Sequence, residues 1–246
     1  MPTIDVTNLD HVRRLDARAV QDSVLLVRQA STTDLLRPTP CSRWTLAGLL
    51  AHMTAQHRGF AAAVEGRGED LAHWRVLPFS GRTMEAVVAE YDAAARQVVA
   101  AFSAVTTPDQ PFFLPEVRGG QAFPAVRAIG FHLVDYVVHA WDVARGLGLT
   151  YDPGAELLAA ALPLARDVPG GATRLAPDSA FGPSLPENEN ENENENEDGE
   201  ADGDGCDGRV LAQILRTLGR SPDWLPPSGE VLATGQRAAT ARDTAC

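Results

Sequence analysis

The stretch that decides the fold is PAVRAIGFHLVDYVVHAWDVARG, residues 124–146. Its apolar side chains recur every three or four positions, which is the period of an α-helix with one buried face. Pro124 suits the first turn of such a helix, and Gly146 and Gly148 suit its end, because proline fits a helix start and glycine a helix stop. The pattern predicts a long amphipathic helix over this stretch.

Three earlier stretches repeat the same helical period. The first is Leu9–Ala30 and the third is Thr83–Val105. The second has Thr45 as its predicted N-cap and ends near Gly66. Residues 106–124 are predicted to be irregular or a short hairpin. Because no alternation of strands and helices supports a doubly wound sheet, the four long helices predict an all-α protein built as a four-helix bundle.

The remainder of the chain is predicted to be a small, partly irregular C-terminal extension. A short helix is expected from Gly154 to Asp167, and Pro163 should kink or interrupt it. A run of alternating Glu and Asn has no large apolar residue to offset the entropy of ordering. The expected segments are the bundle at 1–153, the extension at 154–186, a disordered acidic insert at 187–208, a terminal helix of the extension at 209–224 and a disordered tail at 225–246.

Charge and composition exclude several function classes. The formal net charge is −12, but 11 acidic residues and no basic one lie between Glu187 and Asp207, so the rest of the chain is close to neutral. A nucleic-acid partner is therefore not expected, because such proteins carry a basic excess. All 21 basic residues are arginine. The absence of lysine excludes Schiff-base chemistry and the phosphate-binding lysine of a P-loop.

The cysteines and the distribution of apolar residues indicate the cellular compartment in which the protein is expected. Cys41, Cys206 and Cys246 are far apart and show no Cys-x-x-Cys spacing, which argues against a disulfide framework and favours a reducing environment. The start of the sequence lacks the features of a signal peptide, and no run approaches the roughly 18 apolar residues of a membrane span. We expect a cytoplasmic protein without a membrane partner, as a monomer or homodimer.

Four polar residues on the predicted helices are candidates for chemistry. At about 100° per residue, His132, Asp135 and His139 fall on one narrow, inward face of the last long helix. His52 lies on or beside the apolar stripe of its own helix. Such groups are costly to bury unless something pairs with them, and either a divalent metal or hydrogen bonds within the core would meet that cost. The residues alone leave both interpretations open.

Three motifs resemble one family. PTPCSRWT at 38–45 with LLAHM at 49–53 is similar to the start of the second helix in the mycothiol-dependent maleylpyruvate isomerase-like proteins, of the DinB superfamily of metal-binding four-helix bundles. The pattern DxxxHAWDVA at 135–144 resembles the second half of that family's metal motif. LGRSPDW at 218–224 is similar to the end of one actinobacterial-type subgroup.

The resemblance implies a ligand set and a cofactor. The family's metal ligands fall on His52, Asp135 and His139, and this chain has Asp where the isomerases have Glu. Two histidines and one carboxylate leave positions open, which is typical of catalytic zinc and also suits non-haem iron. The implied activity is a mycothiol-dependent isomerase or S-transferase, in which the metal activates the thiol of mycothiol towards an electrophilic substrate. The alternative is a metal-binding or regulatory bundle without catalysis.

The roles of several residues near the candidate ligands are less clearly indicated by the sequence. His132 matches no family ligand that we can assign, and either supports a ligand from outside the coordination shell or is a histidine of the core. Asp142 either orients a ligand or makes a hydrogen bond within the bundle. Trp44 and Trp141 are expected to be core anchors, and Cys41 is either a small buried thiol or one with a lowered pKa at a helix N-terminus.

Overall fold

The computed structural model describes most of the chain. The described residues are 7–42, 44–79, 81–115, 117, 120–168, 170–175, 181–186 and 203–227. Residues 187–202 of the predicted acidic insert and residues 228–246 of the predicted tail lie outside the described residues.

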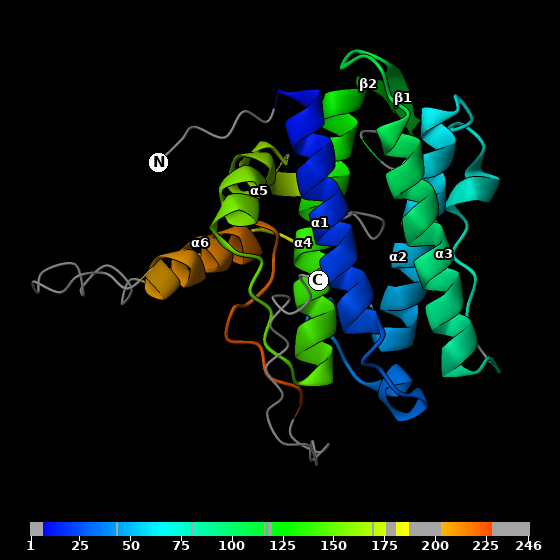
Figure 1. The fold of residues 1–246 in the computed structure, drawn as a ribbon. Coiled ribbons are helices and arrows are strands. Elements are labelled where there is room, and N and C mark those ends of the chain that lie inside the picture. Colours follow the sequence, from blue (N-terminus) through cyan, green and yellow to red (C-terminus); the bar gives the residue numbers. More distant parts are fainter. Residues whose placement is uncertain are drawn as a thin grey trace, which may run out of the picture.

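The described chain is mostly helical and has one small hairpin (Figure 1). The α-helices are α1 (Leu9–Val27), α2 (Leu46–Val64), α3 (Met84–Ser103), α4 (Ala125–Leu147), α5 (Ala155–Asp167) and α6 (Gly203–Thr217). Short 3-10 helices are η1 (Thr32–Leu36), η2 (Leu71–Trp74) and η3 (Gly171–Leu175). The strands β1 (Pro111–Leu114) and β2 (Gln121–Pro124) pair antiparallel, with Pro111 opposite Pro124.

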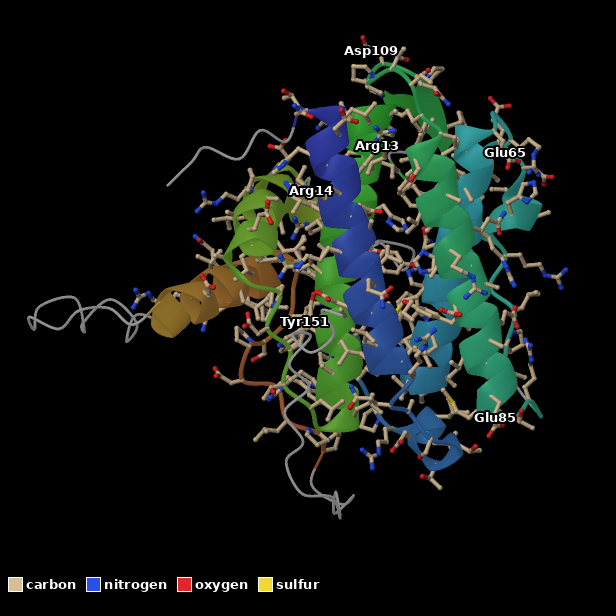
Figure 2. All side chains as sticks on the ribbon, in the orientation of Figure 1. Arg13, Arg14, Glu65, Glu85, Asp109 and Tyr151 are labelled. Atoms are coloured by element: carbon tan, nitrogen blue, oxygen red, sulfur yellow. The ribbon has the colours of Figure 1, made fainter. Side chains whose placement is uncertain are left out.

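Helices α1 to α4 form the bundle, and α5 and α6 pack beside it (Figure 1). Helix α1 lies along α4, and α2 lies along α3. The connection from α2 to α3 crosses the length of the bundle: Glu65 lies at the hairpin end and Glu85 at the opposite end (Figure 2). Helices α2 and α3 therefore run in the same direction, whereas the hairpin makes a short link from α3 to α4.

The structure confirms the all-α prediction and the four long helices. Thr45 is the N-cap of α2 and Thr83 that of α3, each accepting a hydrogen bond from a backbone N–H of the first turn. Helix α4 ends at Gly148, whose φ of 74° is the left-handed conformation that favours glycine. Residues 106–124 contain the hairpin that was one of the two alternatives.

Two local predictions differ from the structure. Helix α5 continues through Pro163, so of the two expected effects, a kink or an interruption, the interruption does not occur. The carbonyl that the proline leaves without a donor belongs to Ala159, and both residues are exposed, so water can satisfy it. Helix α6 begins at Gly203 rather than at Arg209, so its first turns lie inside the stretch 187–208 that was predicted to be disordered. The sequence did not indicate that the helix starts at Gly203, because the Asp and Gly residues of this stretch have low helix propensity.

The core has two apolar parts. Near the hairpin, aromatic side chains such as Phe60, Phe102 and Phe112 pack together, and the remainder of the bundle is filled mainly by Leu, Val and Ala. Polar contacts join the helices at the edges: Arg13 of α1 donates to the carbonyls at the end of α3, and Arg14 forms an ion pair with Glu156 of α5 (Figure 2). None of the helices in the described part of the chain is both long and apolar enough to span a membrane.

A buried carboxyl on α1 makes stability depend on pH. The hydroxyl of Tyr151 donates to Asp22 at 3.3 Å (Figure 2), and burial raises the pKa of Asp22 from 3.8 to about 6, although the charge of Arg18 opposes the rise. The folded state thus favours the protonated carboxyl. This stabilisation is complete below pH 3.8 and is lost as the pH rises through 6.

We expect Asp22→Asn to stabilise the protein at pH 8 by roughly 2 kcal/mol, because the amide needs no ionisation and still accepts from Tyr151. The gain should shrink towards zero near pH 3.5, where Asp22 is protonated in the folded state and mostly protonated in the unfolded state as well. Urea denaturation at the two pH values measures it. The matched control is Asp109→Asn in the exposed turn before β1, which should change stability little at either pH. An equal gain at both pH values would contradict the assignment to Asp22.

Candidate metal centre

Helices α2 and α4 bring the three predicted ligands together. His52 projects from α2, and Asp135 and His139 lie one turn apart on α4, so that one ligand atom from each residue lies within 4.8 Å of the other two. His139 Nε2 is 3.4 Å from Asp135 Oδ1. The His139 side chain is 1% exposed and that of Asp135 is 18% exposed, so the group reaches from the core to a solvent-accessible edge.

An indole ring closes one side of this group. Trp44, in the loop before α2, stacks on His52 with ring centroids 4.2 Å apart and planes 25° from parallel. The same ring is 6.1 Å from that of His139. Trp44 was expected to be a core anchor. It is partly buried and packs against the core while also covering His52, and Trp141 is buried in the core as predicted.

A second carboxylate holds the ring of His139 from behind. Asp142 Oδ2 lies 2.9 Å from His139 Nδ1, which leaves His139 Nε2 directed at Asp135. Burial opposes ionisation of Asp142, but the charge of Arg220 and the hydrogen bond to His139 outweigh it and hold the pKa of Asp142 below its ordinary value. A carboxylate in this position fixes the tautomer and orientation of a metal-ligating histidine. The structure shows the hydrogen bond that both interpretations of Asp142 share, and the orienting role depends on His139 being a ligand.

The charge that balances Asp142 comes from the C-terminal extension. Arg220 follows α6, is 3% exposed, and places Nη2 3.2 Å from Asp142 Oδ2. Burial alone would lower the pKa of Arg220, but the negative charge of Asp142 raises it, with smaller contributions from Cys41 and Asp135. The extension therefore contributes directly to the electrostatics behind His139. Cys41 is a buried thiol, one of its two predicted states.

The structure separates His132 from the candidate ligands. Its Nδ1 lies 2.6 Å from Asp16 Oδ1 on α1, and its Nε2 lies 3.2 Å from His57 Nδ1 on α2. His132 is fully buried and its ring stacks on Tyr136. Of the two interpretations, a histidine of the core agrees with this environment.

Sequence reasoning missed Arg220 and His57 as members of polar clusters. Arg220 was part of the quoted motif LGRSPDW, yet nothing local to it indicates that it reaches a residue of α4 that is 78 positions earlier. His57 is five residues after His52, about 140° away around α2, so the two histidines cannot share one face. No local signal marks His57, because its burial opposite His132 depends on how α2 packs on α4.

The donor set fits a divalent cation. Two imidazole nitrogens and a carboxylate oxygen are ligands of zinc and of several other divalent metals, and three protein ligands leave at least one coordination position open. The side chain of Asp135 is partly exposed, so this group of residues reaches the surface of the protein. Trp44 restricts that access from one side.

Fold and site together define a helical bundle with a candidate metal centre between α2 and α4. The family model of the mycothiol maleylpyruvate isomerase N-terminal domain matches residues 17–144, which span the bundle from α1 to most of α4. The chain belongs to this family. The match confirms the family to which the three sequence motifs pointed.

Similar proteins are known from curated sequences and from solved structures. An uncharacterized protein of Mycobacterium tuberculosis, in strains H37Rv and CDC 1551, is 31% identical over 179 residues, covering 72% of this chain and 86% of the relative. The crystal structure of the mycothiol-dependent maleylpyruvate isomerase aligns with 65% of this chain and 68% of that chain, at 13% identity and a TM-score of 0.49.

Proposed function

We propose that the chain is a divalent-metal-binding protein that acts as a mycothiol-dependent isomerase or S-transferase. His52, Asp135 and His139 would hold the metal, with zinc as the expected ion. The observation that carries the proposal is the convergence of these three ligands from two helices, with Asp142 behind one of them. Membership of the mycothiol maleylpyruvate isomerase family supports the choice of thiol.

The metal would supply one piece of chemistry. A divalent cation with an open position lowers the pKa of a thiol, so that the nucleophilic thiolate exists at neutral pH. A reducing cytoplasm, the compartment that the cysteine pattern predicts, would keep such a thiol reduced.

The residues of the chain supply orientation and electrostatics. Asp142 accepts a hydrogen bond from His139 Nδ1, which keeps Nε2 unprotonated and available as a ligand. Arg220 compensates the buried charge of Asp142, so Asp142 need not take the proton of His139. Trp44 packs its ring against His52 and limits the rotation of that imidazole. These contacts preorganise the site before a metal or substrate arrives.

The test measures metal first and thiol chemistry second. Metal analysis of the purified full chain should find about one divalent ion per chain. The zinc-loaded protein should then raise the thiolate absorbance of added mycothiol at pH 7, and should consume maleylpyruvate or an epoxide only when mycothiol is present. The same protein with His139→Ala is the negative control for both readouts.

The alternative function is a metal-binding or regulatory bundle without catalysis. Stoichiometric metal without any change in thiolate absorbance would favour this alternative and reject the thiol-dependent enzyme. A chain that contains no metal and binds no added zinc would reject both.

A further inference from the structure

A second polar cluster lies inside the bundle, deeper than the candidate metal centre. It consists of Asp16 on α1, His132 on α4 and His57 on α2, joined by contacts of 2.6 Å and 3.2 Å. Asp16 and both histidines are buried, at no more than 1% exposure. The proposed function gives none of the three a role. The cluster separates the aromatic part of the core from the aliphatic part, because His132 touches Phe60 on one side and stacks on Tyr136 on the other.

The ends of the cluster are unsatisfied. His57 Nε2 and Asp16 Oδ2 are buried and have no hydrogen-bond partner among the residues that the structure describes. Buried polar atoms without partners cost stability, and an apolar layer of the same volume would avoid that cost. Such a cluster in an otherwise apolar core calls for an explanation beyond packing.

The spacing of the two imidazoles limits their protonation. His57 Nδ1 and His132 Nε2 are 3.2 Å apart, a distance at which one hydrogen can bridge the two nitrogens. If both rings are imidazolium, each of these nitrogens carries a hydrogen and both rings carry positive charge. Two hydrogens then face each other across the gap. The contact can persist with one ring protonated but must open when both are.

Other groups around the cluster do not relieve this conflict. Tyr91 of α3 packs edge-on against His57, and Tyr136 of α4 stacks on it. Burial raises the pKa of both tyrosine hydroxyls, so both stay neutral in acid. Asp16 is the one facing carboxyl among the described contacts of the two rings, and it is adjacent to His132 rather than to His57.

We propose that Asp16, His132 and His57 form an acid-sensitive latch, in which uptake of a second proton by the pair of imidazoles in acid breaks the contact that joins α2 to α4. Asp16 bonds to the other nitrogen of His132, so α1 stays joined to α4 when the latch opens and the contact that is lost is the one to α2. The latch lies between the same helices that carry His52 and His139, so its opening would draw these two residues apart. The latch itself does not depend on whether the chain binds metal.

The directions of the pKa shifts of His57 and Asp16 agree with a latch that loses stability in acid. Burial, and then the charge of His132, lower the pKa of His57 well below 6.5. An unfolded chain takes up this proton near pH 6.5 and the folded chain does not, so the stabilisation is complete above pH 6.5 and is lost as the pH falls. Burial raises the pKa of Asp16 despite the attraction of His132. Asp16 therefore favours the folded state in acid and cannot account for a loss of stability there.

The first experiment follows stability against pH in the full chain with excess EDTA, so that protonation of metal ligands does not contribute. Below pH 6.5 His57 takes up a proton in the unfolded chain but stays neutral in the folded chain. The unfolding equilibrium constant of the wild-type protein should therefore rise about tenfold for each pH unit below 6.5. In His57→Gln the side chain is uncharged at every pH and can still accept from His132, so this tenfold dependence should disappear. His73→Gln, at a histidine of η2 whose side chain is 29% exposed, is the matched control and should keep it. An unchanged dependence in His57→Gln would overturn the latch.

The second experiment needs no variant and covers the case that His57→Gln does not fold. In the wild-type chain labelled with nitrogen-15 in histidine, the ring signals of His57 should be those of a neutral imidazole at pH 6.5 and should change to those of imidazolium only at the lower pH at which the latch opens. Titration of His57 to imidazolium near pH 6.5 in the folded chain would overturn the proposal.

Discussion

Alanine at any one of His52, Asp135 or His139 should remove bound metal almost completely. Each change leaves two protein ligands, and zinc sites of catalytic type use three. Metal analysis after gel filtration measures the loss. Because a ligand that binds only the folded state stabilises it by mass action, each variant should also lose the rise in melting temperature that added zinc gives the wild-type protein.

Four further variants separate the ligands from their surroundings. Asp135→Glu restores the side chain that the resemblance assigns to the family's isomerases and should keep the metal. Asp142→Asn should weaken binding by about 10–100-fold without abolishing it, as expected for a group that orients a ligand. His132→Gln and His73→Gln should retain the metal, since the structure places neither among the ligand atoms. Loss of metal in His132→Gln together with its retention in Asp135→Ala would reject the ligand set.

Helix periodicity predicted the part of the site that lies within one helix. Asp135 and His139 are four residues apart, so any helix over this stretch places them side by side. That His52 joins them depends on how α2 packs on α4, which no local pattern encodes. The family resemblance supplied that pairing. The structure brings the three residues together, although the ligand role itself remains a prediction.

Contacts made by loops and by distant segments could not be predicted from the sequence. Trp44 precedes the first turn of α2, and the course of its loop decides whether its ring enters the core or covers His52. Arg220 reaches Asp142 only because the extension folds back along α4. Helical periodicity describes one element at a time. It carries no information on such pairings between elements.

Arg220→Met should lower the free energy of unfolding by about 3–5 kcal/mol, because removal of one partner leaves the charge of Asp142 buried and uncompensated. Methionine is similar in length and fills the space of the arginine stem, so the loss would report mainly the charge. Urea unfolding at pH 7.5 with excess EDTA measures it. Arg166→Met, on the exposed face of α5, is the control and should stay within roughly 0.5 kcal/mol of the wild-type value.

The double variant Asp142→Asn with Arg220→Met tests the cause of this loss. It removes both charges while the asparagine oxygen still accepts from His139 Nδ1, so it should recover more than half of the stability that Arg220→Met loses. Recovery would mean that the arginine is retained to keep Asp142 ionised behind His139, since a neutral pair folds nearly as well. If the double variant is as unstable as Arg220→Met alone, the arginine contributes through packing of the extension, with Phe181 beneath its guanidinium as the contact to examine.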